Sequence, residues 1–351
     1  MILQLPSIFE EKQINSVVSI LDRQVPVSAR KGIQFIQSGH SSTSSTLPPN
    51  FKDAVKLVKD TVPRDYNLEL HAPICPHEPS KDLNLAYSKS KNTLLYSVEL
   101  AEAIGAGTLI VHSNTVYRAS AKPQSPAWSV WQERYNDWKV MNKEIRDPLY
   151  VNLEDLARQT KVTIAIENMP VPISADKSLN PKDIHFDPNM VTFEDLIEFC
   201  DRTMGISNLK IVYDTSHALL TKKSLAMFAD IGIRTTEDLL QTPYRGVYPE
   251  YADIFHQPSI DKEARAIYDK GKLASVQLAS TGNTWIAGKQ TSEEGIKLIG
   301  HHYDELLLIA KMTRDASPSI PLSLDILEYD YISRPNQSKA LEKIVQDLYL
   351  S

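Results

Sequence analysis

The sequence is poor in cysteine and has no long apolar run, and each absence excludes a class of protein. Its 351 residues include 2 cysteines, Cys75 and Cys200, which lie far apart in the chain. Two isolated thiols make neither a disulfide framework nor a C-x-x-C zinc or redox motif. No apolar run approaches the roughly 18 residues that a membrane-spanning helix requires. The first residues also lack the basic and apolar parts of a secretion signal. We therefore expect a cytoplasmic protein with reduced thiols and no membrane partner.

An excess of positive charge is also absent. Lysine and arginine total 38 against 44 aspartate and glutamate residues, which gives a net charge of −6 at pH 7. This balance provides no general electrostatic attraction to nucleic acids or acidic membranes. We therefore expect a small-molecule substrate rather than a nucleic acid. The remaining composition, with 42% hydrophobic and 23% charged residues, is typical of a globular protein with a large core.

Strand-like and helix-like patterns alternate along the chain. Short apolar runs predict strands at residues 1–6, 32–37, 67–72, 108–111, 162–169, 209–213, 273–278 and 320–326. Amphipathic patterns predict helices at residues 10–23, 50–61, 83–104, 149–159, 192–204, 295–313 and 338–350. This alternation implies a parallel sheet, and eight such strands fit a closed (β/α)8 TIM barrel of the α/β class. We see no linker that would divide it, so we predict one domain over residues 1–351.

Two segments interrupt the alternation. Residues 114–147, after the fourth strand, carry Trp128, Trp131 and Trp138, and residues 232–258, between strands six and seven, mix tyrosines with prolines. A long aromatic insertion beside a strand end is typical of a lid or an interface, although it can also simply pack against the barrel. We predict that Trp128 and Trp131 contact the substrate. The aromatic insertions also favour self-association into a homo-oligomer.

The predicted strands end in residues that bind metals. In a TIM barrel the active site lies at the carboxyl ends of the strands. Imidazole and carboxylate ligands suit zinc, and carboxylate-rich sets also suit manganese or magnesium. A histidine or an acid at one strand end is commonly a structural residue, but several unpaired charges gathered on one rim would be costly to bury. The pattern therefore predicts a divalent metal site. Its candidate residues are His71, His112, Glu167, Asp214, His217, Gln277 and Asp325.

Several short motifs occur in an order that is typical of one family. They are H-A-P-I at residues 71–74, L-I-V-H at 109–112, I-E-N at 166–168, D-T-S-H-A at 214–218 and I-P-L-S-L-D at 320–325. In this order and spacing they resemble the endonuclease IV/xylose isomerase-like superfamily of metal-dependent TIM barrels. The resemblance extends from the third strand to the eighth, about three quarters of the chain.

The resemblance implies a role for most of the strand-end residues. His71 and His112 match the first-metal histidines of the family, and Glu167 matches its bridging carboxylate. Asp214 matches the metal ligand of the sixth strand. Asp325 stands where the family usually has a glutamate ligand.

Two further positions decide how far the resemblance extends. His217 matches the second residue of a D-x-x-H pair, which binds a third metal in the nucleases and contacts the substrate in the sugar epimerases. Strand seven carries Gln277 where the family normally has a histidine, and a glutamine carbonyl is a poorer zinc ligand than imidazole. The D-x-H motif that completes the third zinc site of endonuclease IV is absent from residues 279–290.

The three-zinc DNA repair site is therefore incomplete, while two overlapping metal positions remain open. One is His71, His112 and Glu167, and the other is Glu167, Asp214, Gln277 and Asp325.

Three functions follow from these residues. The first, which we favour, is a metal-dependent isomerase, epimerase or lyase acting on a sugar or sugar-like substrate. In it Glu167 and Asp325 are the acid–base pair, and His217 and Gln277 contact the substrate. The second is a metal-dependent hydrolase, similar to a phosphodiesterase, that acts on a small substrate. The third is a non-catalytic descendant that binds a ligand.

Overall fold

The structure is a computed structural model, and it describes most of the predicted strands and helices. The described residues are 1–37, 51–73, 83–112, 147–169, 190, 192–230, 232–235, 238, 257–281, 285–286, 289–290, 302–326, 328 and 330–350. Nearly all of the first predicted insertion, including Trp128 and Trp131, and most of the second lie outside these residues. No helix in the described part of the chain is long and apolar enough to cross a membrane.

Parallel strands close into a barrel in the order β1-β10-β7-β6-β5-β4-β3-β2, which confirms the predicted TIM barrel. The first strand pairs with the last through Ile2 opposite Pro321, so the sheet has no open edge at that point. The barrel strands are β1 (Ile2–Ser7), β2 (Arg30–Ile36), β3 (Asn67–His71), β4 (Thr108–His112), β5 (Thr163–Glu167), β6 (Leu209–Asp214), β7 (Leu273–Gln277) and β10 (Pro321–Ser323). A short antiparallel ribbon, β8 (Trp285–Ile286) with β9 (Lys289–Gln290), lies outside the barrel order.

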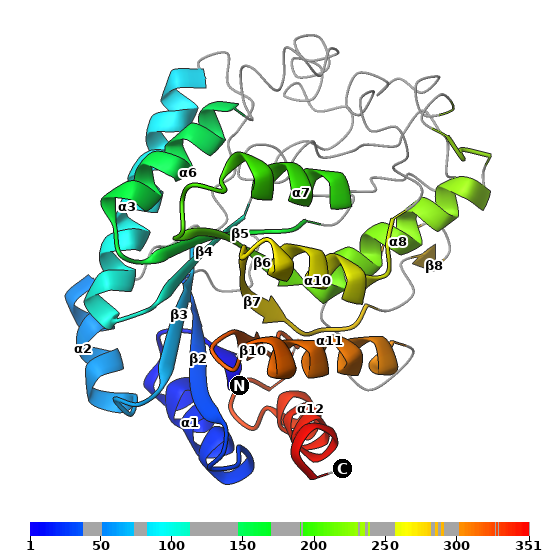
Figure 1. The fold of residues 1–351 in the computed structure, drawn as a ribbon. Helices are drawn as coiled ribbons and strands as arrows, with labels where there is room; N and C mark the ends of the chain where they lie inside the picture. Colours follow the sequence, from blue (N-terminus) through cyan, green and yellow to red (C-terminus); the bar gives the residue numbers. More distant parts are fainter. Residues whose placement is uncertain are drawn as a thin grey trace.

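Helices surround the strands (Figure 1). They are α1 (Glu11–Gln24), α2 (Phe51–Thr61), α3 (Leu83–Ile104), α6 (Asp147–Gln159), α7 (Phe193–Arg202), α8 (Thr215–Asp230), α10 (Ile260–Asp269), α11 (Tyr303–Ala316) and α12 (Pro335–Val345), which continues into a π-helical turn at Gln346–Leu350. The predicted helix at residues 295–313 is α11, although residues 291–301 lie outside the described chain. The sequence prediction assigned no helix to α8 or α10.

The physical reason for missing α8 is its burial. Residues 215–221 are all buried, so its first turns are surrounded by protein and show no polar face. By contrast, α10 has the usual amphipathic spacing, with Ile260, Ala264 and Ile267 buried on one side. Its pattern could have been recognised, but it follows directly on the proline-containing segment that was assigned to the second insertion.

Side chains alternate between the two faces of each barrel strand. One set, including Leu3, Phe35 and Leu70, points outward and joins the main hydrophobic core under the helices. The other set points into the barrel, where Ile110, Ala165 and Val212 form a separate apolar cluster. The strand register places polar residues on the remaining part of this inner surface. They are Gln4, Gln34, Glu69, Ser275 and Ser323, and each is fully buried.

Arg334 joins the two ends of the chain. Its guanidinium is fully buried and donates hydrogen bonds to the Pro6 carbonyl and to Gln337 Oε1, both at 2.7 Å, and to Gln13 Oε1 at 3.2 Å. The residue precedes α12 in a left-handed conformation with a φ of 47°. Its contacts tie α12 to the end of β1 and to α1, and so fix the last helix against the start of the barrel.

Candidate metal centre

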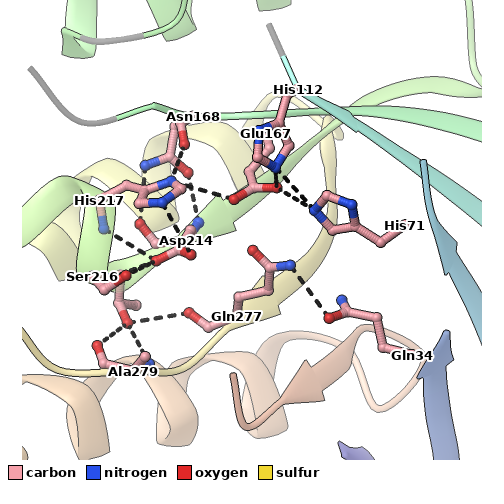
Figure 2. A network of polar contacts seen from close by, with 11 residues as sticks. Gln34, His71, His112, Glu167, Asn168, Asp214, Ser216, His217, Gln277 and Ala279 are labelled. Carbon is pink, nitrogen blue, oxygen red and sulfur yellow. Dashed lines mark hydrogen bonds and ion pairs between the residues drawn. The ribbon is translucent and has the colours of Figure 1, made fainter. Parts of the chain in front are cut away.

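The strand-end residues meet at one end of the barrel (Figure 2). His71, His112, Glu167 and Asp214 are the last residues of β3, β4, β5 and β6, and Gln277 is the last residue of β7. Each follows a largely buried stretch of strand, so packing of the strand fixes where its polar end lies. The parallel register also places His112 directly opposite Glu167, and Asp214 opposite Gln277.

Three donor atoms form a compact triangle. His71 Nε2 lies 3.0 Å from Glu167 Oε2, His112 Nε2 lies 3.0 Å from His71 Nε2, and His112 Nε2 lies 3.2 Å from Glu167 Oε2. We call His71, His112 and Glu167 the metal-candidate triad. Ligands that hold zinc at about 2.0–2.1 Å in a tetrahedron are separated from one another by roughly 3.3–3.4 Å. The triangle therefore has nearly the size of one face of such a site.

The protonation of His71 also favours a cation at this position. Its Nδ1 lies 2.8 Å from the Ala72 carbonyl, to which the ring N–H donates. In the neutral ring Nε2 then has no proton, and its lone pair points at Glu167 and at His112. These electron-rich atoms repel one another unless a proton or a cation lies among them. A metal-binding histidine typically donates its other N–H to a carbonyl in this way, so the triad fits a divalent ion.

Burial and charge set the protonation of the triad. Burial alone would raise the pKa of Glu167, but the attraction and hydrogen bonds of His112 and His71 hold that pKa well below its ordinary value. Burial lowers the pKa of His112. Burial would also lower the pKa of His71, but its bond to Glu167 outweighs this effect and raises it. The carboxylate is therefore ionised at neutral pH, and any proton held by the triad resides on His71.

A second group shares Glu167 with the triad. Glu167, Asp214 and His217 also bring ligand atoms within 4.8 Å of one another. His217 Nδ1 lies 3.3 Å from Glu167 Oε1, whereas Glu167 Oε2 faces the triad. His217 Nε2 lies 3.8 Å from Asp214 Oδ2. The two oxygens of one carboxylate thus face two different groups of potential ligands.

Asp214 is held by the start of α8. Its Oδ1 accepts hydrogen bonds from the Ser216 N–H at 2.6 Å, the Ser216 hydroxyl at 2.7 Å and the His217 N–H at 3.1 Å. This is the geometry of a helix N-cap, which satisfies N–H groups that have no partner within the helix. Oδ1 is therefore occupied, and Oδ2 is the oxygen that faces His217.

Asn168 braces the same region, and the sequence prediction gave it no role. Its Oδ1 accepts from the Asp214 N–H at 2.6 Å, and its Nδ2 donates to the Asp214 carbonyl at 2.9 Å. The backbone carbonyl of Asn168 accepts from His217 Nδ1 at 2.7 Å. Asn168 therefore positions both members of the D-x-x-H pair from the neighbouring strand. The available signal was a polar amide directly after a strand-end glutamate.

Gln277 and Asp325 lie at the edge of these groups. Gln277 is fully buried, its Nε2 donates to Gln34 Oε1 at 3.4 Å, and its Oε1 has no hydrogen-bond partner among the described residues. Figure 2 shows its amide reaching from β7 into the space below Glu167 and His71.

Asp325 follows the end of β10 and is near enough to raise the pKa of His71, but it belongs to neither convergent group. The structure does not describe Trp128 and Trp131, so their predicted contacts with the substrate stay predictions.

Comparison with known proteins agrees with the fold. A family model described as xylose isomerase-like TIM barrel matches residues 26–303. No curated protein matches the sequence. Similar solved structures include endonuclease IV from Thermus thermophilus, with 15% identity, a TM-score of 0.51 and 99% of both chains covered. They also include an L-ribulose 3-epimerase, with 12% identity, a TM-score of 0.56 and coverage of 99% of this chain and 94% of that one. A D-tagatose 3-epimerase-like protein has 14% identity, a TM-score of 0.55 and coverage of 99% and 98%. At these identities the likeness concerns the fold.

Proposed function

The chain belongs to the xylose isomerase-like TIM barrel family, and from this membership we propose that it is a divalent-metal-dependent isomerase, epimerase or lyase acting on a sugar or sugar-like molecule. The observation that carries the proposal is the convergence of two imidazole nitrogens and one carboxylate oxygen within 3.2 Å of one another. A fold alone does not choose a function, so the argument depends on the chemistry of these side chains.

The triad would hold the metal, with open positions for a substrate. When bound there, a divalent ion would supply Lewis-acid chemistry, which would polarise a carbonyl or hydroxyl oxygen and make a proton on the adjacent carbon easier to remove. Zinc, manganese and magnesium all remain candidates, and two imidazole donors favour zinc or manganese over magnesium. His217 is braced by Asn168 and lies beside the shared carboxylate, where it can orient a substrate hydroxyl.

The carboxylates differ in what they can do with a proton. Glu167 stays ionised because its pKa is held well below the ordinary value, which suits a metal ligand but makes it a weak base. Asp325 is partly exposed at the rim, near His71, and the triad does not require it as a ligand. We therefore propose Asp325 as the group that exchanges a proton with the substrate and Glu167 as the carboxylate that would hold the metal.

Gln277 supports a hydroxylated substrate. Its buried Oε1 has no donor among the described residues, and an amide oxygen in this state accepts a hydrogen bond from any hydroxyl brought to it. A sugar supplies several hydroxyls on neighbouring carbons. Gln277 would then select the substrate rather than bind the metal, in line with its weakness as a zinc ligand.

The alternative function is hydrolysis of a small phosphodiester or a related substrate. It would use the same two-histidine triad to hold its metal, so the triad supports both functions. The net charge of −6 gives no general attraction to duplex DNA. If the protein is a hydrolase, we therefore expect a small substrate.

Metal analysis of protein purified without added metal tests the proposal. We expect about one equivalent of a divalent metal in the wild type. The metal should be lost in His71→Ala and kept in Asp214→Asn. His302→Ala is the matched control, because His302 at the start of α11 pairs with Glu305 and belongs to neither ligand group. Absence of metal, together with no gain in thermal stability on adding zinc, manganese or magnesium, would overturn both metal-dependent functions.

Proton exchange separates the two reactions. An isomerase, epimerase or lyase acting by proton transfer incorporates deuterium from D2O into the carbon-bound positions of its substrate, which NMR detects across a panel of ketoses and aldoses. Hydrolysis of a chromogenic phosphodiester without deuterium incorporation would favour the hydrolase instead.

A further inference from the structure

Part of the barrel interior is polar where TIM barrels normally carry branched apolar side chains. Gln4, Gln34, Glu69, Ser275 and Ser323 come from β1, β2, β3, β7 and β10, and each is 0% exposed. We call these five residues the inner polar cluster. They lie on the inner surface of the barrel, which they share with the apolar residues of β4, β5 and β6.

The side chains of the cluster meet near the barrel axis. Strands β3 and β7 lie opposite each other, with three strands between them in either direction. Even so, burial raises the pKa of the Glu69 carboxyl on β3 to about 7, and Ser275 of β7, Gln34 of β2 and Thr108 of β4 are near enough to oppose this rise. Gln4 reaches into the interior over Gly32, where an added Cβ would lie 2.7 Å from Gln4 Cγ. Glycine at position 32 therefore makes room for the Gln4 side chain.

Most polar atoms of the cluster have no well-formed hydrogen bond within the described residues. These atoms are both amide atoms of Gln4, Gln34 Nε2, both carboxyl oxygens of Glu69, Ser275 Oγ and Ser323 Oγ. Buried polar atoms in native proteins are almost always paired, because leaving them unpaired is costly. The neighbouring charge that acts on Glu69 is that of His71, which already pairs with Glu167. A water molecule or an ion would satisfy the atoms that remain unpaired.

We propose that the inner polar cluster binds one monovalent cation, sodium or potassium, inside the barrel beneath the metal-candidate triad. The donors are carboxylate, amide and hydroxyl oxygens, which are hard ligands, and none of the five residues is a histidine or a cysteine. One carboxylate balances one positive charge. The glutamine amides can turn their oxygens inward, since rotation of the amide exchanges O and N. The site is separate from the triad in both its residues and its chemistry.

Thermal unfolding in different salts tests this site. The full-length protein, treated with EDTA, is melted in choline chloride, sodium chloride or potassium chloride at equal ionic strength. We expect a melting temperature roughly 3–6 °C higher in one of the alkali salts, with a half-maximal effect at millimolar concentration. In Glu69→Gln, which keeps the shape of the side chain but removes its charge, this difference should disappear. In Ser323→Ala the half-maximal concentration should rise about fivefold to tenfold.

Glu263→Gln is the matched control, because Glu263 is a buried glutamate that pairs with Tyr213 and Lys222 outside the barrel interior. It should keep the salt-specific shift, and so should His71→Ala, which disrupts the triad. The result for His71→Ala separates this inference from the proposed function. Equal melting temperatures in all three salts would overturn the proposal and leave only water or a neutral carboxyl in the cluster. Stabilisation by divalent ions alone, or a shift that persists in Glu69→Gln, would overturn it as well.

Discussion

Replacing Asn168 by alanine should destabilise the start of α8 and leave Asp214 and His217, the D-x-x-H pair, less firmly positioned. The substitution removes the amide that bonds both the N–H and the carbonyl of Asp214, at 2.6 and 2.9 Å. Asp214 is 3% exposed, so water cannot easily replace these partners. Each buried group left unpaired costs roughly 1–3 kcal/mol, so we expect the free energy of unfolding to fall by about 2–5 kcal/mol.

Asn208 offers a matched control at the opposite end of the barrel. Its Nδ2 donates to the carbonyls of Ala157, Thr160 and Val162 at 2.6, 3.0 and 3.3 Å. Asn208 is only partly buried, so water can replace some of these bonds in Asn208→Ala. We expect a loss of about 1–2 kcal/mol there, without any change at the site.

Urea unfolding measures both losses, and amide hydrogen exchange locates them. The Asp214 N–H should exchange much faster in Asn168→Ala than in the wild type, and at an unchanged rate in Asn208→Ala. If Asn168→Ala is no less stable than Asn208→Ala and the Asp214 amide keeps its protection, then Asn168 does not brace the D-x-x-H pair.

Four further outcomes follow from the structure. The metal affinity of the triad should rise with pH by up to about tenfold per pH unit below the pKa of His71. The reason is that the metal must displace the proton that the raised pKa of His71 keeps on the ring. Metal titrations at pH 6 and pH 8 measure this difference. In the metal-free protein the ion pair between His71 and Glu167 should stabilise the fold below pH 6.5. This stabilisation should be lost as the pH rises through the higher pKa that His71 has in the folded protein, and urea unfolding across that pH range measures the loss. Gly32→Ala should cost about 1–3 kcal/mol in thermal unfolding, since its Cβ would lie 2.7 Å from a backbone oxygen, whereas Gly107→Ala meets nothing within 4 Å and should be far milder. Arg334→Met should cost about 3 kcal/mol in chemical denaturation because it leaves buried acceptors without donors, and a loss below about 1 kcal/mol would contradict the role of that guanidinium.

The sequence predicted the barrel and most of its strand ends because parallel barrel strands are short apolar runs with a polar residue at the carboxyl end. His71, His112, Glu167 and Asp214 were all predictable as members of one rim, and the structure brings them together. Their distances were not predictable, since they depend on the barrel register. Asp325 shows the difference, because it follows a strand that ends earlier than its apolar pattern indicates.

The inner polar cluster was hidden by the same alternation that revealed the strands. L-Q-L around Gln4, I-Q-F around Gln34 and L-E-L around Glu69 look like strands with one face in water. In a closed barrel covered by helices, both faces of every strand are buried. The polar residues of such a pattern therefore lie in the interior, and only closure of the barrel, which no local pattern encodes, reveals this.

The pairing of β1 with β10 has a consequence for synthesis of the chain on the ribosome. One edge of β1 pairs with β2 early, but the other edge finds its partner only after Pro321–Ser323 has emerged from the ribosome. Until then β1 and β7 both present unpaired backbone groups, which are templates for association with other nascent chains. Arg334 follows soon after and fastens the last helix to Pro6. A premature stop before this point would leave a sheet with two open edges, and we expect such fragments to depend on chaperones and to be degraded rather than to accumulate.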